Sequence, residues 1–135
     1  MENYHLLLRQ HHLKATPQRS AILEIMGREG HITIEQIYAR IKQLFPSLSL
    51  ATIYKNMTAM QEQDVIRELK ISGHKNHYEL KKEPHYHMVC DRCGHITDIE
   101  TDIERSLKDL SLQYGFEVSE ISLSVSGVCR ACKQP

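Results

Sequence analysis

All four cysteines of the chain occur in two Cys-x-x-Cys pairs, Cys90/Cys93 and Cys129/Cys132. A spacing of two residues lets a tight turn bring both sulfurs to one tetrahedral ion, and two such pairs complete a four-thiolate site. We therefore predict a structural Zn(2+) site. Two disulfides or a redox pair are the alternatives, but disulfide frameworks belong to small secreted domains, and MENYHLLLRQ at the N-terminus lacks the features of a signal peptide.

Two histidines precede the first cysteine pair at a spacing that could hold another metal ion. His85 and His87 alternate along a predicted strand, so both imidazoles point to one face. Asp98 falls on the predicted returning strand, five positions after Cys93. Five other histidines are expected to be solvated surface residues: His5, His11, His12, His74 and His95.

Three amphipathic helices and a hairpin are predicted in the first half of the chain. Thr16-Pro17 begins a helix that Gly30 ends, the capping box Thr33-x-x-Gln36 begins a second that stops near Pro46, and Ser47 or Ser49 caps a third. Residues 65–71 and 76–80 flank a glycine turn as two short strands. The expected buried positions are Ala21, Ile22, Ile25, Met26, Ile34, Ile37, Tyr38, Ile41, Leu44, Leu50, Ile53, Met57 and Met60.

Three helices followed by a hairpin are typical of a winged helix-turn-helix domain, in which the third helix enters the major groove of DNA. The outer face of the third predicted helix carries Thr52, Lys55 and Asn56, which are suited to base edges and phosphates. A plain helical domain with a solvated polar face is the alternative.

The second half predicts a small α/β module. Thr101-x-x-Glu104 is another predicted capping box, for a helix that Gly115 ends, and apolar residues alternate with serines from 121 to 126. A change of phase at Ser119-Glu120 indicates a bend or bulge. The module is too small to bury much core by itself, so we expect the zinc site and dimerisation to stabilise it. The helix stripe comprises Ile103, Leu107, Leu110 and Tyr114.

The predicted fold class is therefore α+β, with a winged-helix DNA-binding domain at residues 1–81 and a dimerisation and metal-binding domain at 82–135. A hinge is expected at about 81–84, where a polar stretch ends in proline.

Composition and charge fit this division. The 135 residues are 41% hydrophobic and 25% charged, with a net charge of zero. Residues 1–81 hold 11 Lys/Arg and 8 Asp/Glu, a net of +3, whereas residues 82–135 hold 6 and 9, a net of −3. The first half can therefore bind a polyanion. No apolar run approaches the roughly 18 to 20 residues that span a bilayer, so we expect a cytoplasmic protein with no membrane partner.

Four segments in this order resemble the ferric uptake regulator (Fur) family: ATPQR at 15–19, SLATIYKN at 49–56, HYHMVCDRCG at 85–94 and GVC-x-x-C at 127–132. The resemblance covers essentially the whole chain. It implies a homodimeric, metal-dependent transcriptional regulator, usually a repressor, that binds double-stranded operator DNA.

The resemblance also implies a regulatory Fe(2+) or Mn(2+) site that clamps the two domains together, so that DNA binding and metal binding favour the same form. His77 shares a strand face with Glu79 and could substitute or assist. Tyr54 and Lys55 are implied at base edges and Lys14 in a minor groove, with Thr52, Asn56 and Arg19 as further contacts. Tyr54 could instead be a core aromatic residue. The implied metal ligands are His31, Glu79, His85, His87 and Asp98.

Within the family, the His85-Tyr86-His87 segment, Asp98 and Asn56 resemble the peroxide-responsive (PerR) branch. In that branch Fe(2+) reacts with hydrogen peroxide, a ligand such as His31 or His85 is oxidised, the clamp opens and DNA is released. Glu79 departs from the Asp that the branch usually has, so an iron- or manganese-responsive repressor without peroxide sensing is the alternative. An additional site found in many iron-uptake repressors is expected to be absent, because its positions are Pro84, Tyr86, Arg105 and Ile121.

Two other classes of function are disfavoured. A zinc hydrolase would need a His-Glu-x-x-His or a comparable motif with a general base, which the sequence lacks. We therefore expect that the chain is not an enzyme. A zinc-stabilised interaction module without DNA binding would show no salt-dependent affinity for duplex DNA.

Overall fold

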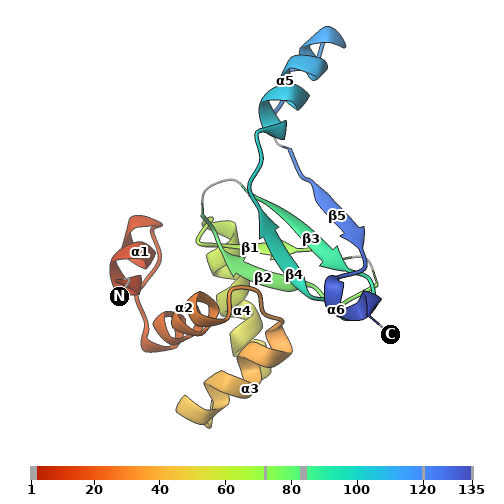
Figure 1. The fold of residues 1–135 in the computed structure, drawn as a ribbon. Helices are drawn as coiled ribbons and strands as arrows, with labels where there is room; N and C mark the ends of the chain where they lie inside the picture. Colours follow the sequence, from red (N-terminus) through yellow and green to blue (C-terminus); the bar gives the residue numbers. More distant parts are fainter. Residues whose placement is uncertain (1–2, 72, 83–84, 120, 135) are drawn as a thin grey trace. The chain divides into compact units, whose positions relative to one another are not determined.

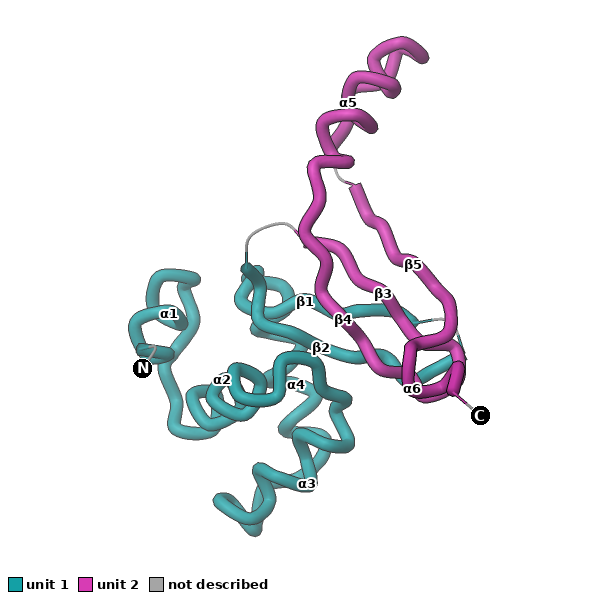
Figure 2. Tube along the Cα trace, viewed as in Figure 1, with its two compact units in different colours: residues 1–82 teal, residues 83–135 magenta. Residues whose placement is uncertain are grey.

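The computed structural model describes residues 3–71, 73–82, 85–119 and 121–134. The chain divides into two compact units, residues 1–82 and 83–135 (Figure 2). Among these residues, the first unit holds four helices and a hairpin, and the second holds a three-stranded sheet with two helices (Figure 1). The predicted α+β class is confirmed.

The first unit begins with a helix that the sequence analysis did not predict, α1 (Tyr4–Gln10). The side chain of Asn3 caps it by accepting a hydrogen bond from the Leu6 amide at 3.1 Å. Leu8 is fully buried in the core of the unit. Gly27 leaves room for the Tyr4 ring, because a Cβ at that position would collide with the Tyr4 hydroxyl.

The three predicted helices are present as α2 (Pro17–Glu29), α3 (Ile34–Leu44) and α4 (Leu50–Glu62). Thr16 caps α2, and Gly30 ends it with a φ of 80°. The predicted capping box of α3 is confirmed in both directions, since Thr33 Oγ1 accepts from the Gln36 amide at 3.2 Å and Gln36 Oε1 accepts from the Thr33 amide at 3.0 Å. Ser49, rather than Ser47, caps α4.

One face of each of these helices packs into a single core. Two predicted core positions are wrong: Leu44 is 62% exposed and Leu50 is 41% exposed. Both lie at the end of a helix, where the backbone leaves the core face, so helical spacing alone places them incorrectly. The buried core residues of the helices are Leu8, Ile22, Leu23, Ile25, Met26, Ile34, Ile37, Ile41, Ile53, Met57 and Met60.

The hairpin consists of β1 (Ile66–Leu69) and β2 (His77–Leu80), paired antiparallel with Arg67 opposite Glu79. A third row is added by the segment that precedes α3. Ile32 forms an isolated antiparallel bridge with Tyr78, with N···O distances of 3.1 and 2.8 Å. The start of α3 is thereby tied to the hairpin.

The second unit has the strand order β4-β3-β5, with β3 (Tyr86–Cys90) in the centre, β4 (Ile96–Ile99) antiparallel to it and β5 (Ser124–Gly127) parallel to it. The parallel pair needs a crossover connection, and α5 (Ile103–Gln113) lies in that connection. A short helix, α6 (Arg130–Lys133), follows β5.

The crossover helix corrects one prediction. Asp102 occupies the N-cap position of α5 and its side chain makes no capping bond, so the capping box predicted at Thr101 and Glu104 is wrong. The apolar stripe of α5 is present, but none of its residues is buried within this chain. Figure 1 shows α5 extending beyond the end of the sheet of its own unit. The predicted bend at Ser119-Glu120 falls partly on Glu120, which lies outside the described residues.

Among the described residues, no helix is both long and apolar enough to cross a membrane.

Candidate metal centres

The four cysteines converge in the second unit. The parallel register places Cys90 opposite Gly127, so Cys129, two residues later, reaches the turn that carries Cys93. The four sulfurs lie within 4.8 Å of one another, and the Cys93 and Cys129 sulfurs are 3.8 Å apart. Zn–S bonds of about 2.3 Å in a tetrahedron require sulfurs separated by about 3.8 Å. The cluster therefore matches a structural zinc site.

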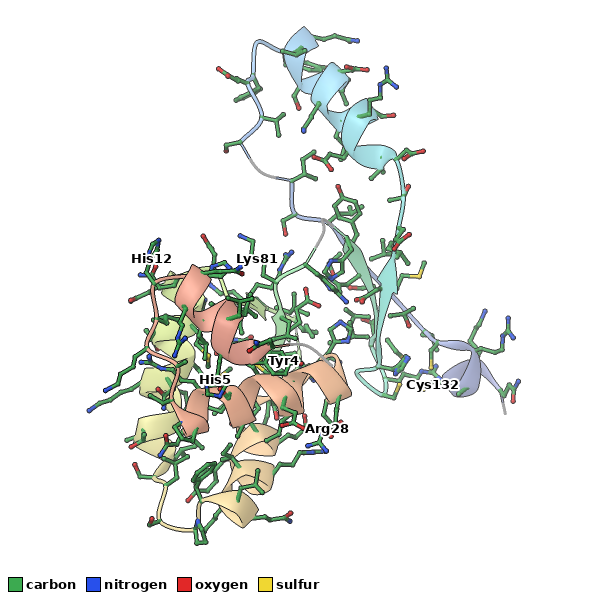
Figure 3. The ribbon with its side chains drawn as sticks, turned by 90° about the vertical axis from the view of Figure 1, so that its left-hand side faces the viewer. Tyr4, His5, His12, Arg28, Lys81 and Cys132 are labelled. Atoms are coloured by element: carbon green, nitrogen blue, oxygen red, sulfur yellow. The ribbon has the colours of Figure 1, made fainter. Side chains whose placement is uncertain are left out.

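Backbone groups around the cluster favour the thiolate form. The amides of Cys129 and Cys93 point at the Cys90 sulfur at 3.3 and 3.5 Å. These amide hydrogen bonds lower the pKa of Cys90 to about 5. The neighbouring sulfurs have the opposite effect on Cys132, whose pKa they raise to about 12. The guanidinium of Arg92 donates to the Cys132 carbonyl at 3.0 Å and holds α6, which carries Cys132 (Figure 3), against the turn.

A second group of possible ligands lies in the first unit. The Ile32–Tyr78 bridge places His31 directly opposite Glu79. His31 Nε2 lies 3.1 Å from Glu79 Oε2, and the Glu79 side chain is only 1% exposed. A buried carboxylate needs a charged or hydrogen-bonding partner. The pair therefore presents one imidazole nitrogen and one carboxylate oxygen in a poorly hydrated place.

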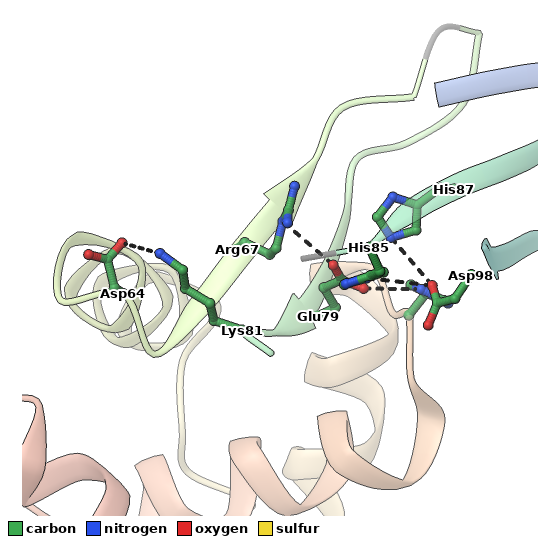
Figure 4. Close-up of polar contacts among 8 residues, drawn as sticks. Asp64, Arg67, Glu79, Lys81, His85, His87 and Asp98 are labelled. Atoms are coloured by element: carbon green, nitrogen blue, oxygen red, sulfur yellow. Dashed lines mark ion pairs between the residues drawn. The ribbon is translucent and has the colours of Figure 1, made fainter. Parts of the chain in front are cut away.

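Arg67, which the sequence motifs did not indicate as a site residue, completes this row from the other side. Its Nε lies 3.5 Å from Glu79 Oε1 (Figure 4). The sequence does contain a signal for this pairing, namely the predicted glycine turn of the hairpin. If the turn is centred on Gly73, residues at equal distances on either side pair with each other, and Arg67 and Glu79 are each six positions from Gly73. We define the cross-strand row as His31, Glu79 and Arg67.

A third group of possible ligands lies on the sheet of the second unit. His87 is opposite Asp98 in the β3–β4 pair. Asp98 Oδ1 lies 3.4 Å from His87 Nε2 and 3.6 Å from His85 Nε2 (Figure 4). Both histidines are buried, and their ring centroids are 4.6 Å apart. Alternation along the strand explains why both imidazoles share a face.

The donor chemistry of these two groups suits a regulatory ion. Imidazole nitrogens and carboxylate oxygens favour Fe(2+), Mn(2+) or Zn(2+), without the thiolates that select zinc strongly. Within each unit, imidazole nitrogens and a carboxylate oxygen lie within 3.1–3.6 Å of each other, although His31 is half-buried and Asp98 is exposed. The residues present therefore fit such an ion.

The sequence model described as the Ferric uptake regulator family matches residues 10–126. The chain belongs to this family. Fur-family proteins are metal-responsive transcriptional regulators rather than enzymes, and they bind DNA and act as dimers. The family membership predicted from the sequence motifs is confirmed.

Individual Fur-family relatives extend this result. The peroxide-responsive repressor PerR of Staphylococcus aureus is 31% identical over 131 residues, which cover 93% of this chain and 86% of the relative. The peroxide stress regulator of Campylobacter jejuni is 36% identical, with a TM-score of 0.78 over 98% of this chain and 100% of that one. The ferric uptake regulator of Vibrio cholerae is 27% identical, with a TM-score of 0.79 over 94% of this chain and 100% of that one.

The residues proposed to contact DNA gather around α4 and the start of α2. Tyr54 is 46% exposed, so the alternative that it is a core aromatic residue is wrong. Lys55 is exposed beside it, whereas Thr52 and Asn56 are half-buried. Lys14 is exposed in the segment that leads into α2.

Arg19 links these elements rather than extending freely into solvent. Its Nε donates to Asn56 Oδ1 at 3.0 Å, and its Nη1 donates to the Lys14 carbonyl at 2.9 Å. This arrangement fixes the exposed end of the Asn56 side chain and the path of the Lys14 segment. Arg19 is thus placed to orient two candidate contacts.

The remaining histidines have local roles. His77 Nδ1 lies 2.8 Å from the Lys75 carbonyl within the hairpin. His11, predicted to be solvated, is half-buried, and its Nδ1 lies 2.8 Å from the Gln63 carbonyl. His5 and His12 are exposed at the N-terminal end of the first unit (Figure 3).

Proposed function

We propose that this protein is a homodimeric transcriptional repressor that senses hydrogen peroxide through metal-catalysed oxidation of a histidine ligand. Two chemically distinct sets of ligands support the proposal. The four-cysteine cluster offers only sulfur, whereas the other two groups offer only imidazole and carboxylate. One permanent Zn(2+) and one exchangeable Fe(2+) or Mn(2+) follow from that difference.

In this proposal the regulatory ion takes ligands from both units, namely His31 and Glu79 from the first and His85, His87 and Asp98 from the second. Fixing both units to one ion favours the arrangement that binds operator DNA, because a ligand that prefers one form shifts the equilibrium towards it. Removal of any one ligand weakens this linkage.

The pair of His31 and Glu79 is the observation that carries the proposal. The Ile32–Tyr78 bridge brings the half-buried His31 imidazole to within 3.1 Å of the buried Glu79 carboxylate. Fe(2+) held by these ligands would catalyse cleavage of the peroxide O–O bond, with no net change in its own oxidation state. Hydrogen peroxide would be the two-electron oxidant: one of its oxygens would enter a ring C–H bond of His31 or His85, and the other would leave as water. The oxidised ring is a poorer ligand, so the units separate and DNA is released.

The cysteines have no sensing role in this scheme. Zinc holds their thiolates, and their oxidation would unfold the second unit rather than signal reversibly. Tyr54 and Lys55 are proposed to contact base edges, with Lys14 in a neighbouring minor groove. Thr52, Asn56 and Arg19 support these contacts.

The test loads the zinc-containing dimer with Fe(2+) without oxygen, adds one equivalent of hydrogen peroxide, and measures peptide masses together with binding to a duplex selected from random sequence. We expect one added oxygen on the peptide that carries His31 or on the peptide that carries His85, with loss of DNA binding. The Mn(2+)-loaded protein serves as the control, because its peptide masses and its DNA binding should both be unchanged by peroxide.

A second candidate function is an iron- or manganese-responsive repressor without peroxide sensing. Glu79 favours it, because the peroxide-responsive branch usually has Asp at this position. Unmodified histidines with DNA binding retained after peroxide would support this candidate and contradict the first.

A further inference from the structure

The cross-strand row ends in a guanidinium that the proposed sensing scheme does not use. The two oxygens of Glu79 face different groups: Oε2 lies 3.1 Å from His31 Nε2, and Oε1 lies 3.5 Å from Arg67 Nε. Arg67 holds this position because the hairpin register sets it opposite Glu79. Its side chain is 35% exposed, whereas that of Glu79 is 1% exposed.

We propose that Arg67 sets the affinity of the regulatory site: it neutralises the Glu79 carboxylate when no metal ion is bound and repels a divalent ion when one binds. The inference rests on the proposed function in one respect, namely that Glu79 is a ligand of the regulatory ion.

The metal-free half of the argument follows from burial. A carboxylate removed from water is costly unless opposite charge or hydrogen bonds replace its hydration. A guanidinium is charged at every accessible pH. Because its Nε lies 3.5 Å from Glu79 Oε1, Arg67 supplies opposite charge to this buried carboxylate.

The metal-bound half follows from the position of the guanidinium. Glu79 and His31 would hold a divalent ion on a carboxylate that already has the Arg67 guanidinium beside its other oxygen. Like charges at this separation repel, and the repulsion is only partly screened because one side of the row is buried. The site thus binds any divalent ion more weakly than its ligands alone would allow.

A weaker site has a regulatory consequence. A sensor responds to changes in metal supply only if its ion exchanges over the range in which the free metal varies, and the Arg67 charge moves the site towards exchange. Because the effect is a charge effect, it should be nearly equal for Mn(2+) and Zn(2+). A role of Arg67 in shaping the ligand geometry would instead change the two affinities by different factors.

The experiment uses the full-length protein with its cysteine site filled by zinc, and titrates Mn(2+) and then Zn(2+) calorimetrically. We expect Arg67→Gln to bind both ions about three- to tenfold more tightly, the modest size reflecting screening of a partly exposed charge. Arg67→Lys keeps the charge and should resemble the unsubstituted protein. Arg40→Gln is the matched control, because Arg40 forms a comparable pair with Glu29, at 2.7 Å, elsewhere in the first unit.

A second readout needs no regulatory ion. In the metal-free, zinc-stabilised protein at neutral pH, Arg67→Gln should lower the melting temperature. The same substitution on a Glu79→Gln background should have little effect, because the charge that Arg67 compensates is gone.

The outcomes separate the two proposals. Unchanged or weaker Mn(2+) binding by Arg67→Gln, alongside weakened binding by Glu79→Gln, would overturn the role of Arg67 alone. Undiminished Mn(2+) binding by Glu79→Gln would overturn the assignment of Glu79 as a ligand, and with it the regulatory site from which the inference starts.

Discussion

The two units of this chain are stabilised in different ways. In the first unit, four helices and a hairpin enclose a continuous apolar core that includes Ile22, Met26 and Ile37. In the second, the buried apolar residues among those described are few, and Leu110 and Phe116 are exposed. The first unit therefore has the core of an independent domain, whereas we expect the second to need its cysteine cluster and further apolar contacts for stability.

Because of this difference, the possible ligands of the first unit and those of the second are held in place in different ways. Glu79 lies on the hairpin and His31 on the segment bridged to it, and both are anchored to a well-packed core, so their geometry is set by the first unit itself. His85 and His87 lie on β3 and Asp98 on β4, in the same sheet that carries Cys90. In the proposed scheme, zinc must therefore bind before the regulatory ion does.

Loss of a zinc ligand should produce the largest difference in stability between the two units. Structural zinc sites contribute on the order of 10 kcal/mol, so a Cys132→Ser variant should lose the second unit while the first stays folded. Hydrogen exchange should show loss of protection across β3, β4 and β5 and retained protection in α2 to α4. Ser126→Ala, at an exposed position on β5, is the control, and simultaneous loss of both units would contradict the prediction.

A cavity in the first unit should have the next largest effect and should spare the second unit. Ile37 is fully buried, so Ile37→Ala should lower the free energy of unfolding of the first unit by about 2–5 kcal/mol. Amide exchange along α3 measures this loss. Leu44→Ala, on the same helix but at an exposed position, should change stability by less than about 0.5 kcal/mol. Equal effects at the two positions would refute the assigned core.

An acidic residue on the exposed stripe of α5 should weaken self-association without unfolding either unit. Burial of a leucine is worth about 1.5–3 kcal/mol, so Leu110→Asp should raise the dimer dissociation constant by about one to two orders of magnitude. Sedimentation equilibrium measures this change. Lys108→Gln on the same helix should leave it nearly unaltered, and an unchanged constant for Leu110→Asp would exclude this face from the interface.

The smallest effect is expected from the cap that begins α3. Loss of an N-cap side chain costs about 1 kcal/mol, so Thr33→Ala should destabilise the first unit by that amount, whereas Thr33→Ser should restore most of it. Thermal unfolding followed by circular dichroism distinguishes the variants. Full stability of Thr33→Ala would mean that the capping box contributes nothing beyond the adjacent bridge.

Much of this architecture could be predicted because local chemistry determines it. Thr16, Thr33 and Ser49 each precede a helix with a side chain that satisfies a free backbone amide, and the two cysteine pairs specify a four-sulfur cluster by spacing alone. α1 could not be predicted because its seven residues, with three consecutive leucines, are too short a segment to show a helical period. The start of α5 was misplaced because Thr101 and Asp102 are adjacent candidates for one cap.

Long-range pairing explains what could not be predicted. Nothing local in the sequence indicates that β5 pairs parallel to β3, yet that register brings Cys129 to Cys90. Likewise, His31 was implied as a ligand only by family resemblance. Its position opposite Glu79 depends on the Ile32–Tyr78 bridge, which joins residues 46 positions apart in the sequence.

That bridge consists of two backbone hydrogen bonds, and the residues that adjoin it carry an imidazole and a carboxylate. An ion held by His31 and Glu79 would have to leave, or lose one ligand, before the segment ahead of α3 could separate from the hairpin. Exchange of the Ile32 and Tyr78 amides with solvent would therefore report on the occupancy of the site, because its rate should fall with the fraction of time that the site is empty.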